Sequence, residues 1–291
     1  MRYLLIVFLS FVSFFGFAQE NDVVRSDIDL RIFSDYVSKY AGKKELPGGT
    51  LLVETGKYFL GSPYVSGTLE QSTPEKLIVN LRAFDCTTFV ETCLALSRML
   101  KNEAFDAKQP IDKNFEIFTE ELRKIRYRDG KIDEYPSRLH YFSDWIYNNQ
   151  KKGIVTDVTS ACGGISFLVE TGFMSKNPDK YAQLKNNSLY VAEIVETEIS
   201  INARNYYYIP KANISKRKSL IQSGDIIAFT TSIPGLDVSH VGLAVWKKNE
   251  LYLLHASLTE GKAVLSSQPL SAYTHSIKRH TGVMVARPIG K

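Results

Sequence analysis

One cysteine stands where a catalytic nucleophile could form. Cys86 follows Asp85, a residue type preferred at helix N-caps, and opens a stretch whose apolar side chains recur with helical spacing. A thiol in the first turn of a helix lies at the positive end of the helix dipole, which favours the thiolate. The sequence therefore predicts that Cys86 is a nucleophile with a lowered pKa. The alternative is an ordinary core cysteine, as we expect for Cys93 on the same helical face.

Two histidines are candidates for the base and its orienting partner. His240 leads into an apolar, β-prone run over 241–246, and His255 ends the next such run, which begins at Leu251. Pairing of the two runs as a hairpin brings both imidazoles to one end of the sheet. We expect His240 to take the Cys86 proton, while His255 accepts the Nδ1 proton of His240 and fixes its tautomer. Each histidine alone could equally be a satisfied, partly buried imidazole.

The elements that must position these residues are helices first and strands afterwards. Apolar periodicity predicts helices over 26–40, 50–59, from Cys86 onward, 114–125 and 143–149. Short β-prone runs separated by turn signals lie at 206–209, 225–230, 241–246, 251–255 and 283–286. This order predicts an α+β fold, with the helix of Cys86 packed on an antiparallel sheet that carries the histidines. No repeat or domain boundary is visible, so we expect one domain over 19–291 with a long insertion at about 101–205.

The first 18 residues have the features of a secretory signal peptide. Arg2 gives a positive start, 4–17 are mostly apolar, and Gly16 and Ala18 supply the small residues of a cleavage site. We expect cleavage after Ala18, with an uncleaved anchor as the alternative, and no stable membrane insertion after the signal is removed. Three cysteines in an exported chain cannot all pair within it, so at least one thiol is free.

Composition bounds the class of protein. Hydrophobic residues make up 44% of the chain and charged residues 23%, which is ordinary for a globular protein and excludes a disordered one. The net charge of +5 suits an acidic polymer but is too small and scattered to indicate nucleic acid. His275 and His280, near the C-terminus, are expected at the surface and not as metal ligands.

Short sequence blocks resemble those of the NlpC-type papain-like cell-wall peptidases. The blocks are Gly61-Ser62-Pro63-Tyr64, Asp85-Cys86-Thr87-Thr88-Phe89-Val90, Gly224-Asp225-Ile226-Ile227-Ala228-Phe229, His240-Val241-Gly242-Leu243-Ala244 and His255-Ala256-Ser257. The resemblance implies a papain-like fold in which Cys86 is the nucleophile, His240 the base and His255 the orienting residue. It also places Tyr64 beside the nucleophile, where its hydroxyl and the Cys86 N–H stabilise an oxyanion. Asp225 is expected to be structural.

Two departures narrow the resemblance to one branch. Thr87-Thr88 replaces the usual Ser-Gly, and the interval between Cys86 and His240 is long. With the segment 135–145, these features resemble the N-acetylmuramoyl-L-alanine amidase-like branch. That resemblance implies cleavage between N-acetylmuramic or anhydro-muramic acid and L-Ala in small muropeptides. The alternatives are an endopeptidase that cuts the stem peptide after D-Glu, and a catalytically inert wall-binding protein.

The branch also sets expectations for partners and substrate contacts. We expect a monomeric bacterial protein, periplasmic or secreted, that acts on peptidoglycan or muropeptides without a metal or other cofactor and without nucleic acid. Its expected substrate-binding residues are Asp85 and Ser239 beside the catalytic groups, and Arg138, His140, Tyr141 and Trp145 in the insertion. For Tyr141 and Trp145, four residues apart, the alternative is one buried helix face.

Overall fold

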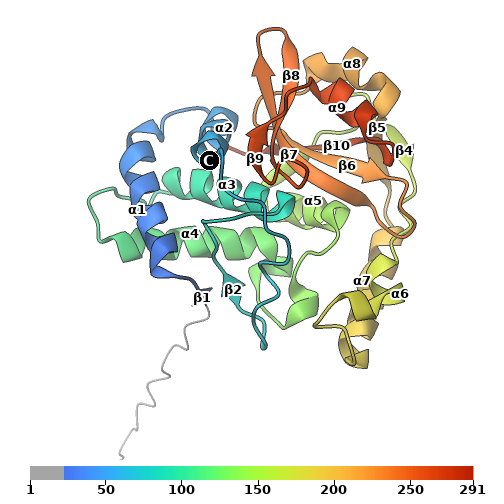
Figure 1. The fold of residues 1–291 in the computed structure, drawn as a ribbon, viewed down its shortest axis with the longest axis horizontal. Coiled ribbons are helices and arrows are strands. Elements are labelled where there is room, and N and C mark those ends of the chain that lie inside the picture. The colour runs from blue at the N-terminus through green and yellow to red at the C-terminus, as the bar shows by residue number, and fades with distance from the viewer. Residues whose placement is uncertain (1–22, 291) are drawn as a thin grey trace, which may run out of the picture.

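Helices fill the first half of the chain in the computed structural model, which describes residues 23–290 (Figure 1). They are α1 Asp27–Tyr40, α2 Gly48–Tyr58, α3 Cys86–Leu100, α4 Ile111–Arg126 and α5 Phe142–Lys151. Strands β1 Val23–Val24 and β2 Leu77–Ile78 form a small parallel pair beside them. Each helix expected from periodicity is present, with ends that differ by a few residues at most. The signal peptide expected over 1–18 lies outside the described residues.

A reciprocal cap fixes where α3 begins. An Asp85 carboxylate oxygen accepts from the Thr88 N–H at 2.8 Å, and the Thr88 hydroxyl accepts from the Asp85 N–H at 2.9 Å. Such a capping box satisfies two backbone donors that would otherwise lack partners. The capping box thus explains why this chain has Thr88 where the cell-wall peptidases that it resembles usually have glycine. It also makes Cys86 the first residue of the helix.

The second half of the chain builds an antiparallel sheet. Its strand order is β4 Ile165–Phe167, β5 Tyr206–Pro210, β10 His280–Pro288, β6 Ile226–Thr231, β7 Val238–Lys247, β8 Glu250–Ser257 and β9 Lys262–Leu265, and β3 Val155–Asp157 pairs with β10. The five predicted strands are present. The α+β class predicted from the sequence is therefore confirmed, with helices packed against an antiparallel sheet.

The sheet has apolar side chains on both faces because both are covered. Ala228 and Val241 face α2 and α3 in the larger core, whereas Ile227 and Phe229 belong to a second core under α8 Ile214–Arg217 and α9 Leu270–Ser276. Strands buried on both faces lose the clean alternation of apolar and polar residues. Figure 1 shows α9 across the end of the sheet where β7 begins.

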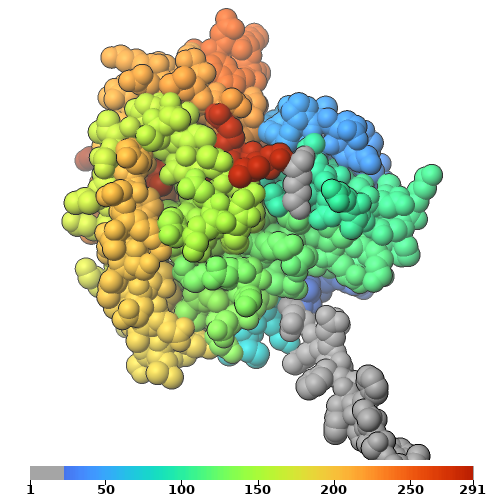
Figure 2. All heavy atoms as spheres, turned by 180° about the vertical axis from the view of Figure 1, so that it is seen from behind, coloured from blue at the N-terminus to red at the C-terminus, as the bar shows by residue number. Residues whose placement is uncertain are grey.

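The segment 101–205, which the sequence analysis expects to be an insertion and which is called the insertion below, lies against the helical core and spreads over the face seen in Figure 2, in green to yellow. Besides α4 and α5 it contains the short α6 Phe173–Lys176 and α7 Ser188–Asn202. Buried Glu91 of α3 binds it twice, accepting from Arg126 at 2.7 Å and from the Trp145 indole at 3.2 Å. No helix within 23–290 is long and apolar enough to cross a membrane.

Candidate active site

The sulfur of Cys86 is held against the strand that carries His240. The thiol is half-buried and free, and the Val241 N–H donates a hydrogen bond to it, as do the N–H and hydroxyl of Thr87. The Val241 N–H belongs to the peptide bond that joins His240 to Val241. The start of α3 and the start of β7 therefore meet at this sulfur, although they are far apart in the sequence.

The lowered pKa expected for this thiol is wrong for the folded chain. Burial and, after it, the neighbouring Asp85 carboxylate raise the pKa of Cys86 to about 12, although hydrogen bonds from Val241 and Thr87 offset part of the shift. Burial also lowers the pKa of His240 well below its ordinary value, and His255 and His280 add to that effect. Each charge alone is disfavoured by burial, which favours a neutral thiol and a neutral imidazole in the free protein.

A β-bulge precedes His240 in β7. His240 pairs with Phe229, but the next pair joins Thr230 to Val238, so the exposed Ser239 is an extra residue in β7. A bulge bends its strand and increases the local twist, and it commonly re-aims a side chain next to a site. Ser239 therefore has a conformational role at this position.

The two imidazoles form a direct pair. Nε2 of His240 lies 2.7 Å from Nδ1 of His255, and the ring centroids are 4.8 Å apart. The pairing of the two histidines is confirmed, but the nitrogen expected for His240 is wrong, because Nε2 and not Nδ1 makes the contact. Burial lowers the pKa of His255 to about 4, which keeps this ring neutral and able to accept the Nε2–H of its neighbour.

The absence of a side chain at Gly242 allows His255 of the neighbouring strand to pack closely against it. A Cβ at this position would lie 2.9 Å from the His255 Cβ and 2.8 Å from a methyl carbon of Leu253. Both distances are too short for real contacts. The glycine of the His240-Val241-Gly242 block is therefore required by the neighbouring strand.

Aromatic rings enclose the imidazole pair. Phe229 lies between His240, at 5.7 Å, and His280, at 4.7 Å, and the Tyr273 ring of α9 covers His255 at 5.3 Å. The surface position expected for His280 is wrong, since 3% of this residue is exposed. Tyr273 was not predicted, because it stands in a short helix with no motif around it. The rings exclude water from the pair on this side.

Tyr64 reaches the site on an extended segment. Its N–H donates to the Gly261 carbonyl at 2.8 Å, and it forms an isolated bridge with Phe84, two residues before Cys86. Burial, together with the nearby Cys86 and Asp85, raises the pKa of Tyr64 to about 12. The phenol is therefore protonated, and so a donor, across the physiological range.

Most of the expected substrate-binding residues are engaged within the protein. Trp145 and Tyr141 are buried, with the Trp145 indole bound to Glu91 and the Tyr141 hydroxyl donating to Glu198 at 2.6 Å. Neither exposes a face to a ligand, so the alternative of a buried helix face describes them. His140 lies against Tyr135, its Nε2 2.9 Å from the Tyr135 carbonyl, and burial lowers its pKa to about 3.

Arg138 and Asp85 also make their polar contacts within the protein and not with a ligand. Arg138 is 6% exposed and bound to two carboxylates described below, while Asp85 caps α3. Of the six expected residues only Ser239 is exposed. Elsewhere, Cys93 is buried in the core as expected, and the thiol of Cys162 donates to the Leu220 carbonyl at 3.3 Å. Within 23–290 no three His, Cys, Asp or Glu side chains are arranged to hold a metal ion.

A cavity of about 410 Å³ adjoins His255. Its wall combines His255 and the aromatic ring of Tyr273 with hydroxyl and amide groups, supplied by Ser257, Thr259, Ser266, Ser267, Ser276 and Gln268. Rings and hydroxyl groups in one wall suit a ligand that has both apolar and polar faces. No sequence pattern predicts this cavity, because its residues come from β8 and the turn after it, from β9 and the segment that follows it, and from α9.

Cys86 stands at the start of a helix, and the histidine pair stands on two strands of an antiparallel sheet. This α+β arrangement is typical of papain-like proteins, and comparisons with known proteins identify the family. The N-acetylmuramoyl-L-alanine amidase-like (AmiA-like) family pattern matches residues 54–283. The chain belongs to this family. The branch resemblance drawn from the sequence is thereby confirmed. Among curated proteins, none matches the chain.

Solved structures agree with the family. An N-acetylmuramoyl-L-alanine amidase from Bacteroides uniformis is 40% identical, with a TM-score of 0.76, over 83% of this chain and 98% of that one. A Bacteroides fragilis protein, named provisionally as a xylanase, is 42% identical, with a TM-score of 0.74, over 80% and 99% of the two chains. The Legionella pneumophila protein LPG0564 is 24% identical, with a TM-score of 0.65 over 90% and 96%, and shares the fold.

Proposed function

We propose that this protein is a cysteine-dependent amidase that cuts the bond between N-acetylmuramic or anhydro-muramic acid and L-Ala in peptidoglycan fragments. The proposal is carried by the hydrogen bond from the Val241 N–H to the Cys86 sulfur, because Val241 directly follows His240 in the chain and His240 is paired with His255. Family membership and the amidase name of the Bacteroides uniformis protein support the choice of bond.

The mechanism follows from the two neutral groups. As Cys86 attacks the amide carbonyl, its proton moves to Nδ1 of His240, the ring nitrogen that His255 leaves available. His255 accepts from Nε2–H, which fixes the tautomer and stabilises the imidazolium. The Cys86 N–H at the start of α3 and the Tyr64 hydroxyl stabilise the oxyanion. His240 then protonates the leaving amine, and water hydrolyses the thioester.

The groups present favour acyl transfer over glycoside hydrolysis. Hydrolysis by a xylanase rests on a pair of carboxylates that flank the glycosidic bond. Around Cys86 lie the Tyr64 phenol and one carboxylate, that of Asp85, which is engaged in capping α3. Within the amidase proposal, the hydroxyl-lined cavity beside His255 has the volume and the donors to receive part of a muropeptide.

Product analysis tests the choice of bond. A defined disaccharide-peptide muropeptide is incubated with the protein, and the products are separated and weighed by mass spectrometry. The proposal expects free sugar together with an intact peptide that begins with L-Ala. Release of a fragment cut after D-Glu would indicate the endopeptidase instead. A substrate consumed equally by wild type and Cys86→Ala would show that the cysteine is not the nucleophile, and no consumption by either would favour the inert wall-binding protein.

We also propose that the protein acts outside the cytoplasm, in the periplasm or medium of a bacterium. The proposal rests on the signal-like residues 1–18. Fractionation of producing cells and N-terminal sequencing test it, with a mature chain that begins at Gln19 as the expected result.

A further inference from the structure

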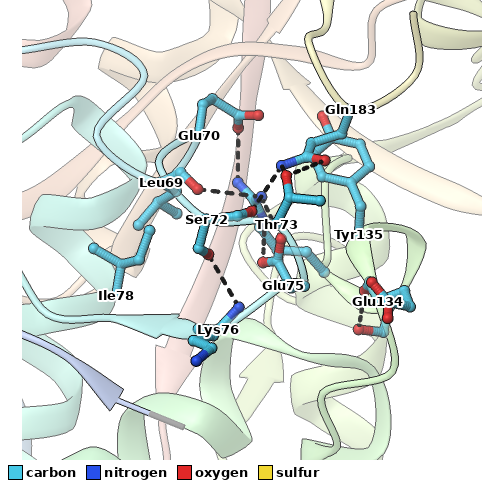
Figure 3. Close-up of polar contacts among 12 residues, drawn as sticks. Leu69, Glu70, Ser72, Thr73, Glu75, Lys76, Ile78, Glu134, Tyr135 and Gln183 are labelled. Carbon is cyan, nitrogen blue, oxygen red and sulfur yellow. Dashed lines mark hydrogen bonds and ion pairs between the residues drawn. The ribbon is translucent and has the colours of Figure 1, made fainter. Parts of the chain in front are cut away.

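One arginine of the insertion holds the chain segment that follows Tyr64. Arg138 donates from Nε and Nη2 to the two carboxylate oxygens of Glu75, each at 3.0 Å, and from Nη1 to Glu70 at 2.8 Å. The Leu69 carbonyl also accepts from Nη2, at 3.5 Å, and Figure 3 shows Leu69, Glu70 and Glu75 close together on this segment. Both glutamates lie on the segment 65–76, which leaves the site at Tyr64. A two-pronged contact of this kind fixes orientation as well as distance.

Further contacts make this segment rigid. The Tyr127 hydroxyl donates to Glu75 at 2.8 Å, and Gln183 donates to the Ser72 carbonyl at 2.8 Å (Figure 3). The ring of Tyr135 stacks under the Arg138 guanidinium, 4.9 Å from its centroid. Glu134, just before it, has φ 54°, a strained value for a residue with a side chain, which persists only where its surroundings hold it.

The insertion also contacts the loop that leads into β7 and His240. The Ser143 N–H, in the first turn of α5, donates to a carboxylate oxygen of Asp237 at 2.7 Å, and the other oxygen accepts from the Val238 N–H at 2.6 Å. Asp237 is buried and stands three residues before His240. A carboxylate at a helix N-terminus is favoured by the helix dipole and by unpaired N–H groups. This contact anchors the loop that leads into the bulge at Ser239.

We propose that the segment 138–143 is a positioning bracket, in which Arg138 fixes the segment that carries Tyr64 and the N-terminus of α5 fixes the loop that carries His240. The inference rests on the proposed function and assigns Arg138 and Asp237 as positioning residues that do not touch substrate. Buried ion pairs add little net stability but define geometry. A displacement of about 1 Å at reacting groups is enough to cost about 100-fold in rate.

Two matched pairs of variants test the bracket. Arg138→Gln is compared with Arg98→Gln, because Arg98 forms a similarly buried pair with Glu121, at 2.7 Å, but in the C-terminal half of α3. Asp237→Asn is compared with Asp225→Asn, because buried Asp225 pairs with Arg287 at 2.8 Å and precedes β6, near the other end of the sheet. The measurements are kcat, KM, Tm and amide hydrogen exchange over 64–76 and 231–239.

If the bracket positions the site, its variants should lose kcat while the control variants lose only stability. A merely structural role would lower Tm without this difference in kcat. Arg138→Gln and Asp237→Asn should each lower kcat by at least 10-fold with KM within 3-fold, and should speed exchange only in the loop that each holds. The control variants should lose comparable Tm while kcat stays within 3-fold of wild type. Arg138→Lys, which keeps the charge but not the fork, should recover part of the lost rate.

An unchanged kcat in either bracket variant, or an equal loss in its control, overturns the proposal. If Arg138→Gln does not fold, Glu75→Gln is measured in its place by the same criteria. The exchange data separate this inference from the proposed function. If the wild type has no amidase activity, the proposed function fails, while unchanged exchange in both loops would still refute the bracket.

Discussion

Nε2 of His240 and Nδ1 of His255 are 2.7 Å apart, across two neighbouring strands of the sheet. In the proposed mechanism, this contact leaves Nδ1 of His240 as the nitrogen that takes the proton of Cys86. It also defines what a replacement of His255 must provide, namely an acceptor at the place of Nδ1, close to the backbone, and not at the end of a longer side chain.

The activity of His255 variants should therefore depend on where the new side chain places its hydrogen-bond acceptor. The side-chain oxygen of Asn occupies about the place of Nδ1 in His, whereas Gln places its oxygen further out. We expect His255→Ala and His255→Gln to lower kcat by about 100-fold or more, and His255→Asn to lose clearly less, because loss of an orienting acceptor impairs the base. Steady-state kinetics on a muropeptide, with Tm measured in parallel, check the order. Equal activity of all three variants would remove His255 from the mechanism.

Gly242 offers a way to disturb the same pair without touching either ring. A Cβ there meets His255 at 2.9 Å and Leu253 at 2.8 Å, so Gly242→Ala should displace the second imidazole. We expect a loss of about 1–3 kcal/mol in unfolding free energy from overpacking, and a fall in kcat of about 10-fold or more. Gly42→Ala is the control, because nothing lies within 4 Å of its Cβ. Wild-type kcat in Gly242→Ala would show that the close approach is not needed.

The pKa directions make a prediction about the resting state. Burial raises the pKa of Cys86 to about 12 and lowers the pKa of His240, so the free protein should hold few thiolates at neutral pH. Alkylation of Cys86 by iodoacetamide, followed by peptide mass spectrometry, should therefore be slow at pH 7 and should rise steadily up to pH 10. A fast plateau between pH 5 and 8 would instead reveal a preformed thiolate–imidazolium pair and contradict the prediction.

The sequence was enough for the parts of the site that local patterns encode. The capping residue Asp85 located the start of α3 to the residue, and two apolar runs located the hairpin of β7 and β8. Tyr64 stood in a short block with a recognisable order. These features depend on residues close to one another in the chain, which is why sequence patterns detect them.

The remaining features depend on contacts between distant segments. Arg138 reads from the sequence as a free cation beside aromatic residues, yet it pairs with Glu70 and Glu75, more than 60 residues earlier. The pKa of Cys86 was misjudged for the same reason, because the helix dipole is visible in the sequence but the burial of the sulfur is not. Neither Tyr273 nor the nitrogen used by His240 has any local signal.

His280 allows a prediction about stability. Its ring stacks on Phe229 at 4.7 Å, and its Nδ1 is buried with no hydrogen-bond partner among residues 23–290. A buried polar atom without a partner costs about 1–3 kcal/mol. Phenylalanine has a similar shape and no such atom. We therefore expect His280→Phe to raise Tm at pH 7 by about 2 °C or more.

The same substitution should matter more in acid. Burial lowers the pKa of His280 to about 4, below the 6.5 of an ordinary histidine, so the unfolded chain takes up a proton first. The stability is complete above pH 6.5 and is lost as the pH falls towards 4. At pH 5 this histidine should cost about 2 kcal/mol, which His280→Phe removes. The Tm difference between variant and wild type should therefore be larger at pH 5 than at pH 7. His275→Phe, at an exposed position, is the control, and equal differences at the two pH values would show that the His280 pKa is not lowered.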